Sequence, residues 1–354
     1  MREIHYTPKR IFIDEASVGD PLTERITSAF PHVSSEVTKD LQALVQSGRF
    51  GRETLFLTRN RGAFVKRFEP SKDAPPCGEM FITPILNCNF RCSYCYLKSY
   101  LDFNSIVVFT NMNDMVKEVR EKLNEGSAER FTTGEFSDSL TLEHVTSTAR
   151  TLLPLFAGSR ARLELRTKSS RTDPITSIFD DPSFEGLNDR LIVTWTLGPA
   201  EMIEREEPGT AALSERIDAI AQTTKSRISV GLRLDPIIPY YFDAGAYEDI
   251  VSAVALKAET ELINRIELGV LRFPSGLIEL IGRQSPASNI LKGEFVRNLE
   301  GRYVLYRPAR LRIYREIIAI IERHLPSVPI ELSMESYDTW ENLGLEPFER
   351  QDDL

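Results

Sequence analysis

The stretch EMFITPILNCNFRCSYCY, residues 79–96, places Cys88, Cys92 and Cys95 directly after an apolar, β-branched run. Such a run predicts a buried strand, so the three cysteines lie on the loop that leaves its end. Three thiolates on one loop can bind three irons of a cubane cluster. The fourth iron then stays open, because the only other cysteine, Cys77, lies before the strand. An open coordination site is what binding of a small ligand requires.

The spacing of the three cysteines, with three residues and then two between them, is identified as the signature of radical S-adenosylmethionine enzymes. The resemblance implies a [4Fe–4S] cluster held by Cys88, Cys92 and Cys95, with S-adenosylmethionine bound to the open iron. One alternative is a structural zinc site, which wants four ligands and would have to recruit Cys77 or one of four histidines. A set of inert buried cysteines is a further alternative, although the loop also carries Asn, Arg and Ser.

After the cysteines, apolar runs alternate with segments of helical periodicity. The apolar runs are RFTTG (130–134), RLELRTK (162–168), LIVTWTL (191–197), RISVGLRL (227–234) and RIELGVL (265–271). The helical segments are 111–123, 142–156, 210–222 and 246–258, with Asn111 and Thr210 as predicted N-caps of the first and third. Counting the run at 79–86, six strands alternate with helices. This predicts an α/β fold with parallel pairing, a partial (β/α)6 TIM-type barrel, because a closed barrel needs eight units.

The ends of the chain do not follow this alternation. Residues 1–76 predict a small N-terminal extension with a strand at 54–58, joined through the polar, Pro-rich segment 69–76. Residues 77–335 predict the radical enzyme barrel. A helix near 310–324 and a strand at 329–334 are predicted additions at its C-terminal end, and 336–354 is a tail.

The net charge of −9 weighs against broad, non-specific binding to a phosphate backbone. Two segments, 283–312 and 160–171, are rich in Arg and Lys and predict either basic patches or solvated faces of mixed charge. The chain has no apolar stretch long enough for a transmembrane helix, and its first residues lack the apolar centre of a signal peptide. We therefore expect a cytoplasmic protein that is not bound to a membrane.

From about 77 to 333 the sequence is similar to the spore photoproduct lyase family, radical enzymes that reverse a thymine-dimer lesion in DNA. The likeness is carried by Ser-Asp at 137–138 before a helix, Thr-Lys at 167–168, Glu-Pro-Gly-Thr at 207–210, Leu-Arg-Leu-Asp-Pro-Ile at 232–237 and Tyr-Val-Leu-Tyr at 303–306. Of these stretches, those at 137–138, 167–168 and 232–237 lie at the ends of predicted strands. In a βα barrel such positions converge on one face, where active sites lie.

The resemblance also implies site residues. Ser137, Asp138, Lys168 and Thr196 would contact S-adenosylmethionine, and a lysine can pair with its carboxylate. Thr196 stands where the family usually has Ser. Tyr94 and Tyr96 flank Cys95, as two tyrosines do in the family, where they resemble a relay for hydrogen atoms. They could equally be aromatic side chains that pack against the cluster.

One position departs from the family pattern. Spore photoproduct lyases have a cysteine two residues before the Ser-Asp pair, where it donates a hydrogen atom to the product radical. This chain has Glu135 there, and a carboxylate has no weak X–H bond to give. Cys77 or the tyrosines would then have to donate, or Glu135 binds a different substrate or moves a proton.

The resemblance implies that electron transfer to the bound sulfonium produces a 5′-deoxyadenosyl radical, which takes a hydrogen atom from the substrate. We expect a nucleoside-like or other small-molecule substrate. The alternative substrate is damaged DNA, and an electron donor such as flavodoxin or ferredoxin is implied as a partner. An alternative that is not an enzyme is a non-catalytic iron–sulfur protein for redox transfer or sensing. The oligomeric state is left open.

Overall fold

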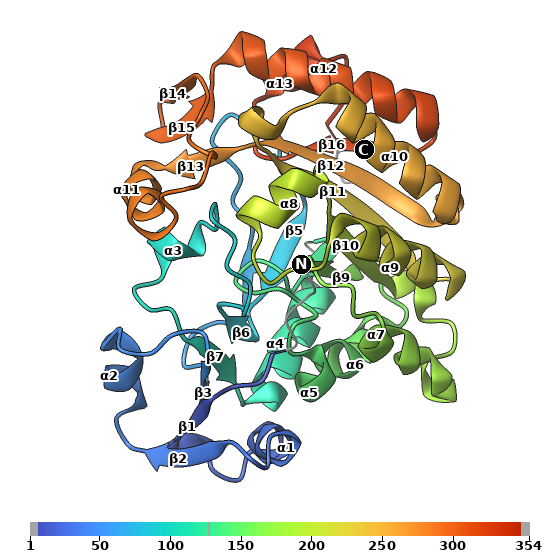
Figure 1. Cartoon of the computed structure of the whole chain (residues 1–354). Coiled ribbons are helices and arrows are strands. Elements are labelled where there is room, and N and C mark those ends of the chain that lie inside the picture. Colours follow the sequence, from blue (N-terminus) through green and yellow to red (C-terminus); the bar gives the residue numbers. More distant parts are fainter. Residues whose placement is uncertain (1–5, 127, 348–354) are drawn as a thin grey trace.

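The computed structural model describes residues 6–126 and 128–347. Its largest sheet has eight strands in the order β16-β12-β11-β10-β9-β8-β5-β4, and it curls into an open barrel (Figure 1). The bounds are β4 Val65–Arg67, β5 Glu79–Ile82, β8 Arg130–Thr132, β9 Arg162–Thr167, β10 Leu191–Thr196, β11 Ser229–Ile237, β12 Ile263–Val270 and β16 Ile330–Leu332. All pairings from β5 to β16 are parallel, and β4 adds an antiparallel edge. The predicted partial barrel is confirmed.

Helices cover the outer face of this sheet. They are α4 Met112–Glu125, α6 Thr148–Leu152, α9 Leu213–Lys225, α10 Ala244–Lys257 and α12 Arg307–His324. Their apolar faces, which include Val119, Ile220 and Ile317, share one core with outward strand residues such as Leu163 and Val193. Alternate residues of each strand therefore face the helices, and the others face the lumen.

One predicted helix start and one predicted helix differ in the structure, and one predicted N-cap is confirmed in position. Thr210 does not cap α9, which begins after Ala212, because the Thr210 hydroxyl donates to the carbonyl of Glu207 at 2.8 Å. Asn111 stands at the N-cap of α4, but its amide bonds to the backbone of Asn60 instead. The predicted helix 142–156 is broken into α5 Glu143–Thr146, α6 and a 3₁₀ turn, because Ser147 adopts a left-handed φ of 48°.

A second sheet has five strands in the order β2-β1-β3-β7-β6. The bounds are β1 Arg10–Asp14, β2 Ser34–Thr38, β3 Thr54–Thr58, β6 Ile85–Leu86 and β7 Ile106–Phe109, with α1 Pro21–Ala29 and α2 Leu41–Gln46 beside it. The single strand predicted at 79–86 is wrong. It divides at Thr83 and Pro84 into β5 of the barrel and β6 of this sheet, because Pro84 has no N–H to continue a ladder.

The cysteine-bearing segment is therefore held between the two sheets. The predicted boundaries at 76 and 335 stay a prediction, and the pairing of β6 and β7 with the N-terminal strands crosses the first of them. Residues 1–5 of the predicted extension and 348–354 of the predicted tail lie outside the described residues.

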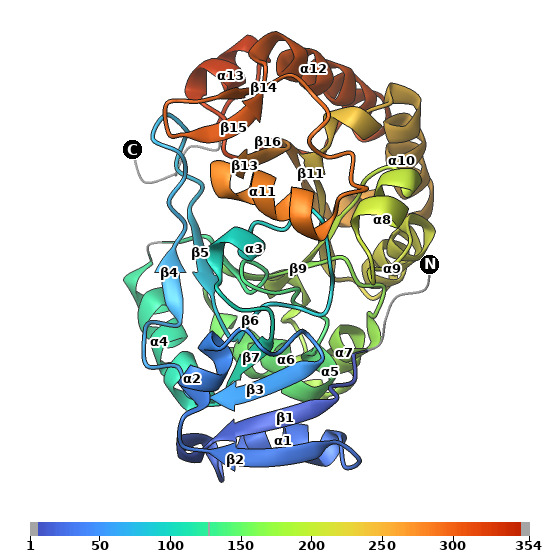
Figure 2. The same ribbon diagram turned by 60° about the vertical axis from the view of Figure 1, so that its left-hand side comes forward.

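The remaining elements lie around the open side of the barrel (Figure 2). They are α3 Leu97–Tyr100, α8 Ala200–Glu206, α11 Ser275–Gln284 and a small sheet of β13 Arg272–Pro274, β14 Phe295–Arg297 and β15 Arg302–Leu305. Two short helices, α7 Asp173–Thr176 and α13 Tyr337–Asn342, pack instead against the core that the outer helices share. Among the described residues no helix is both long and apolar enough to cross a lipid bilayer. The expected cytoplasmic location stays a prediction.

Ion pairs fill the lumen of the barrel, and we call the following residues the lumen network: Glu79, Arg130, Glu164, Arg166, Arg233, Asp235, Arg265, Glu267, Arg272 and Glu331. Arg130 on β8 pairs with Glu331 on β16 at 2.9 Å, although these strands lie far apart in the sheet order. Only a curled sheet brings them together. Arg166, in segment 160–171, is 8 % exposed. It therefore belongs neither to a basic surface patch nor to a solvated face of mixed charge, the two surfaces expected from the sequence.

Glu164 lies at the centre of this network and generates a stability prediction. It is fully buried, and Arg265 contacts it at 2.6 Å. Burial by itself raises the pKa of Glu164, but the charges of Arg166 and Arg265 outweigh it and hold the pKa well below its ordinary value. A depressed carboxylate pKa adds stability above the unfolded-state pKa, and this stability is lost as the pH falls through the folded-state pKa.

We expect Glu164→Gln to lower the free energy of unfolding by about 3–5 kcal/mol at neutral pH, because it leaves Arg265 buried without a full partner. The difference in unfolding free energy between Glu164→Gln and the unmodified protein should shrink below about pH 4, because protonation of Glu164 removes its stabilising charge. Urea unfolding at several pH values measures this. Glu322→Gln on the exposed face of α12 is the matched control. An unchanged unfolding midpoint for Glu164→Gln at neutral pH would contradict the role of the network.

Candidate active site

The cysteine loop, residues 87–96, runs from β6 to α3 at the mouth of the barrel. Cys92 is buried, Cys88 and Cys95 are half-buried, and none of the three belongs to a disulfide. The end of α8 holds this loop through its backbone. Ser93 N–H donates to the carbonyl of Glu206 at 2.8 Å, and Arg91 N–H donates to that of Pro208 at 3.0 Å.

The side chain of Glu206 adds to this hold. Its carboxylate accepts from the hydroxyl of Ser93 at 2.5 Å and from that of Tyr241 at 2.6 Å. On the barrel side, Ser137 donates to the carbonyl of Asn87 at 2.8 Å. Contacts within the protein therefore hold the loop from both sides.

The three thiols suit an iron–sulfur cluster better than a single metal ion. Burial raises the pKa of Cys88 to about 11 and raises that of Cys92 further, so their thiolates need a cationic centre for stability. Over residues 6–126 and 128–347, no three His, Cys, Asp or Glu side chains converge on the position of one metal ion. A cubane differs from zinc in this respect, because each thiolate binds a separate iron.

Ser137 and Asp138 lie where β8 gives way to the loop before α5. The carboxylate of Asp138 accepts from the N–H of Lys168 at 2.7 Å and from the hydroxyl of Thr167 at 2.9 Å. Burial raises its pKa to about 6. These bonds tie the end of β8 to the end of β9. A contact of Ser137 or Asp138 with S-adenosylmethionine stays a prediction.

Lys168 and Thr196 meet at the ends of β9 and β10. The Lys168 ammonium donates to the hydroxyl of Thr196 at 3.3 Å and lies 5.8 Å from the centre of the Tyr94 ring. The structure thus brings a cation, a hydroxyl and an aromatic ring together beside Cys92. This grouping is suited to a ligand with a carboxylate and polar atoms.

Tyr94 is anchored by a residue to which sequence reasoning assigned no role. Its hydroxyl donates to Glu207, and Arg216 pairs with the same carboxylate at 2.5 Å. Glu207 is 1 % exposed and Arg216 is fully buried. The signal was present in the periodicity of α9, where Arg216 shares the apolar face with Ile217 and Ile220.

Tyr96 and Glu135 form a second pair of the same kind. The Tyr96 hydroxyl lies within hydrogen-bond distance of two Glu135 oxygens, the backbone carbonyl at 2.7 Å and the carboxylate at 2.8 Å, and Arg166 of the lumen network stands 3.9 Å from that carboxylate. Gly134 permits this approach, since a Cβ there would lie 2.4 Å from the Cβ of Arg166. Each tyrosine beside Cys95 therefore directs its hydroxyl to a glutamate, and an arginine lies near the carboxylate of that glutamate.

The two pairs also fix the protonation of the phenols. Burial of the hydroxyls, together with the charges of Glu207 and Glu135, raises the pKa of Tyr94 and of Tyr96 well above the ordinary value. Both side chains remain neutral phenols at physiological pH. A direct transfer of either hydrogen to a substrate radical would first have to break its bond to the carboxylate.

Comparison with known proteins agrees with this site. The family model described as spore photoproduct lyase matches residues 6–332. The chain belongs to the spore photoproduct lyase family. A variant of spore photoproduct lyase with bound AdoMet and dinucleoside spore photoproduct superposes with a TM-score of 0.78 at 18 % identity, covering 92 % of this chain and 99 % of that one.

A second structure, spore photoproduct lyase complexed with dinucleoside spore photoproduct, gives a TM-score of 0.76 at 18 % identity over 93 % of this chain and 100 % of that one. No curated protein sequence matches. As a member of the spore photoproduct lyase family, the protein is a radical S-adenosylmethionine enzyme, and its cofactors are a [4Fe–4S] cluster and S-adenosylmethionine. The alternative of a non-catalytic redox or sensor protein is therefore wrong.

The assignment of the cluster ligands generates a prediction. Changing Cys88, Cys92 or Cys95 to Ser should abolish the broad visible absorbance of the reconstituted cluster, because a cubane with two thiolates lacks a third anchor. Cys77→Ser is the matched control and should retain iron and sulfide at the level of the unmodified protein, since Cys77 lies on the far side of β5. Loss of the cluster in Cys77→Ser would contradict the assignment.

The hydrogen bond between Tyr94 and Glu207 leads to a second prediction for this site. We expect Glu207→Gln to cost about 3–5 kcal/mol of stability, because Arg216 then keeps a buried charge without its partner. It should also weaken binding of S-adenosylmethionine as Tyr94 and Lys168 lose their positions. Urea unfolding and equilibrium dialysis measure the two effects, and Glu204→Gln on the exposed side of α8 is the control. Equal stability of Glu207→Gln and the control would contradict the anchor.

Proposed function

We propose that this enzyme abstracts a hydrogen atom from a nucleoside-like small molecule, and that it ends its reaction without a thiol donor at position 135. The observation that carries the proposal is the Tyr96–Glu135 hydrogen bond at 2.8 Å beside the cysteine loop. A carboxylate in this place can accept a proton or bind a polar group, but it has no hydrogen atom of thiol type to give.

When bound, the cluster and S-adenosylmethionine supply a 5′-deoxyadenosyl radical at the mouth of the barrel. The residues of the chain position and enclose it. Cys88, Cys92 and Cys95 would hold the cluster, Lys168 would pair with the methionyl carboxylate, and Thr196 would offer its hydroxyl to the same ligand. Ser137 and Asp138 hold the adjoining loops in position through their hydrogen bonds to Asn87 and Lys168.

Glu135 and Tyr96 face the substrate side in this proposal. The Tyr96 side chain is 38 % exposed while its hydroxyl is engaged, so the ring edge can contact a substrate. Glu135 would accept a proton from the substrate or hold one of its N–H groups, with Arg166 lying 3.9 Å from its carboxylate.

A second candidate is repair of the thymine-dimer photoproduct in DNA. Membership of the spore photoproduct lyase family favours it, and solved lyases have been seen with dinucleoside spore photoproduct. Either function needs an electron to reduce the cluster before S-adenosylmethionine is cleaved, and only a reaction that does not regenerate S-adenosylmethionine consumes one electron in each turnover. We propose a flavodoxin or ferredoxin as the donor.

Formation of 5′-deoxyadenosine decides between these candidates. The cluster is reconstituted without oxygen, and S-adenosylmethionine and reductant are added with either deuterated thymine nucleosides or dinucleoside spore photoproduct. Substrate-dependent 5′-deoxyadenosine carrying deuterium from a nucleoside supports the first proposal. Efficient repair of the photoproduct with full regeneration of S-adenosylmethionine would overturn it in favour of the second.

The substitution Glu135→Cys tests the role of this position directly. A thiol there can donate a hydrogen atom to a product radical, so we expect repair of dinucleoside spore photoproduct to rise at least about tenfold, or about 1.4 kcal/mol in barrier height. Glu135→Ser, which removes the carboxylate without adding a weak S–H bond, is the matched control. An equal rise in both variants would show that Glu135 merely blocks the substrate.

A further inference from the structure

Arg52 lies in the turn that enters β3 and has no part in the site described above. Its Nη1 atom is buried without a hydrogen-bond partner. No carboxylate among residues 6–126 and 128–347 forms an ion pair with this side chain. A buried guanidinium nitrogen is costly to leave without an acceptor, so this one points to an anionic group beside it.

The turn keeps its own carboxylate away from Arg52. The carbonyl of Gly51 accepts from the N–H of Thr54 at 3.0 Å, which closes a β-turn with Arg52 in its second position. The carboxylate of Glu53 folds back and accepts from the N–H of Gly51 at 3.2 Å. A Cβ at position 51 would lie 2.5 Å from that carboxylate and would displace it. The neighbouring acid is therefore bonded to the turn itself.

Strand pairing places this turn beside the start of the cysteine loop. Leu55 at the start of β3 lies opposite Ile106 of β7 in a parallel pair. Leu86 at the end of β6 lies opposite Val107 of β7 in an antiparallel pair. The beginning of β3 and the end of β6 are thus at the same edge of the sheet, and Asn87 begins the cysteine loop there.

An aromatic anchor fixes the turn at this edge. The ring of Phe50 packs edge-on against Phe12 and Phe56, with centroid distances of 5.1 and 5.7 Å. Leu86, the last residue before the cysteine loop, packs against the same apolar cluster. The turn of Arg52 and the segment that enters the cysteine loop consequently share one core, which holds them in a fixed relative position.

The charge of Arg52 acts on the cysteine loop from this side. Burial raises the pKa of Cys88 to about 11, and the positive charge of Arg52 is the strongest of the effects that oppose this rise. Burial also lowers the pKa of Lys98 on α3, and the charge of Arg52 lowers it further. The guanidinium therefore lies close enough to influence the first cysteine of the loop and the helix that follows the last one.

We infer that Arg52 raises the reduction potential of the iron–sulfur cluster by placing a fixed positive charge beside Cys88. A cubane held by three thiolates carries a net negative charge, which grows when the cluster takes up an electron. A nearby cation therefore stabilises the reduced form more than the oxidised form. The inference uses the assignment of Cys88 as a cluster ligand and goes beyond the proposed function, because it does not depend on the substrate.

A redox titration of the reconstituted full-length enzyme, followed by the EPR signal of the reduced cluster, measures this effect without substrate. Arg52→Gln should shift the equilibrium about tenfold toward the oxidised cluster, which is a fall in midpoint potential of about 59 mV. Arg52→Lys keeps the charge and should restore most of the potential. An unchanged midpoint potential in Arg52→Gln would overturn the inference.

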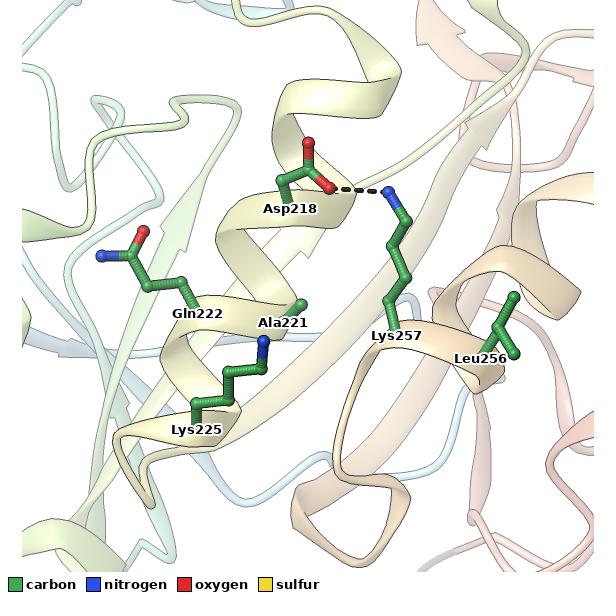
Figure 3. A pocket seen from close by; sticks show the side chains of 6 residues that line it. All are labelled: Asp218, Ala221, Gln222, Lys225, Leu256 and Lys257. Carbon is green, nitrogen blue, oxygen red and sulfur yellow. Dashed lines mark hydrogen bonds and ion pairs between the residues drawn. The ribbon is translucent and has the colours of Figure 1, made fainter.

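Two matched controls remove one positive charge elsewhere. Arg49→Gln changes an exposed side chain just before the same turn. Lys225→Gln changes an exposed side chain in a groove between α9 and α10 on the outside of the barrel, where Lys257 pairs with Asp218 (Figure 3). Both should leave the midpoint potential unchanged. If either lowers it as much as Arg52→Gln does, the effect is one of net charge and the inference fails.

The iron and sulfide content of the variants separates an electrostatic role from a structural one. If Arg52→Gln and Arg52→Lys both lose the cluster, Arg52 only supports the fold of the loop and the inference is wrong. If Arg52→Gln alone loses it and Arg52→Lys keeps the unmodified potential, a positive charge is required beside Cys88 and the inference is supported. Neither result bears on the proposed function, which is tested separately by 5′-deoxyadenosine formation from nucleosides.

Discussion

The barrel depends on charge pairing across its lumen. Arg130 reaches from β8 to Glu331 on β16, and Arg265 on β12 contacts Glu164 on β9. Each of these ions is costly to bury alone, so the sheet keeps the curvature at which every charge meets an opposite one. An apolar lumen would tolerate small changes of curvature more easily, because dispersion contacts are not directional. The strand ends that carry the site are consequently held in fixed positions.

The same principle extends to the reactive centre. Tyr94, Glu207 and Arg216 repeat the arrangement of Tyr96, Glu135 and Arg166, on the opposite side of Cys95. In both, the phenol hydroxyl contacts a glutamate, and a buried arginine lies near the carboxylate of that glutamate. The tyrosines are thus positioned by the protein rather than left for a ligand to orient. Because Arg166 belongs to the lumen network, Glu135 connects the lumen charges to the cysteine loop.

Much of this arrangement was predictable from the residues. The alternation of apolar runs with helical segments predicted the partial barrel, and six of its parallel strands were expected within a few residues. The division of 79–86 into two strands was not predictable, because a segment that contributes to two sheets has the same composition as one long strand. The lumen charges were visible as Arg and Glu alternating with Leu in 162–166, but period two alone cannot say whether the polar face meets water or a lumen.

By itself the sequence determined the order of strands and helices, the three-thiol loop after the first strand and the position of Glu135 two residues before Ser137 and Asp138. These are local properties, set by spacing and side-chain chemistry. The tertiary structure decided that Glu135 accepts from Tyr96 and that Glu207 accepts from Tyr94. Those contacts join residues up to more than a hundred positions apart, so they exist only once the sheet has curled and its charges have paired.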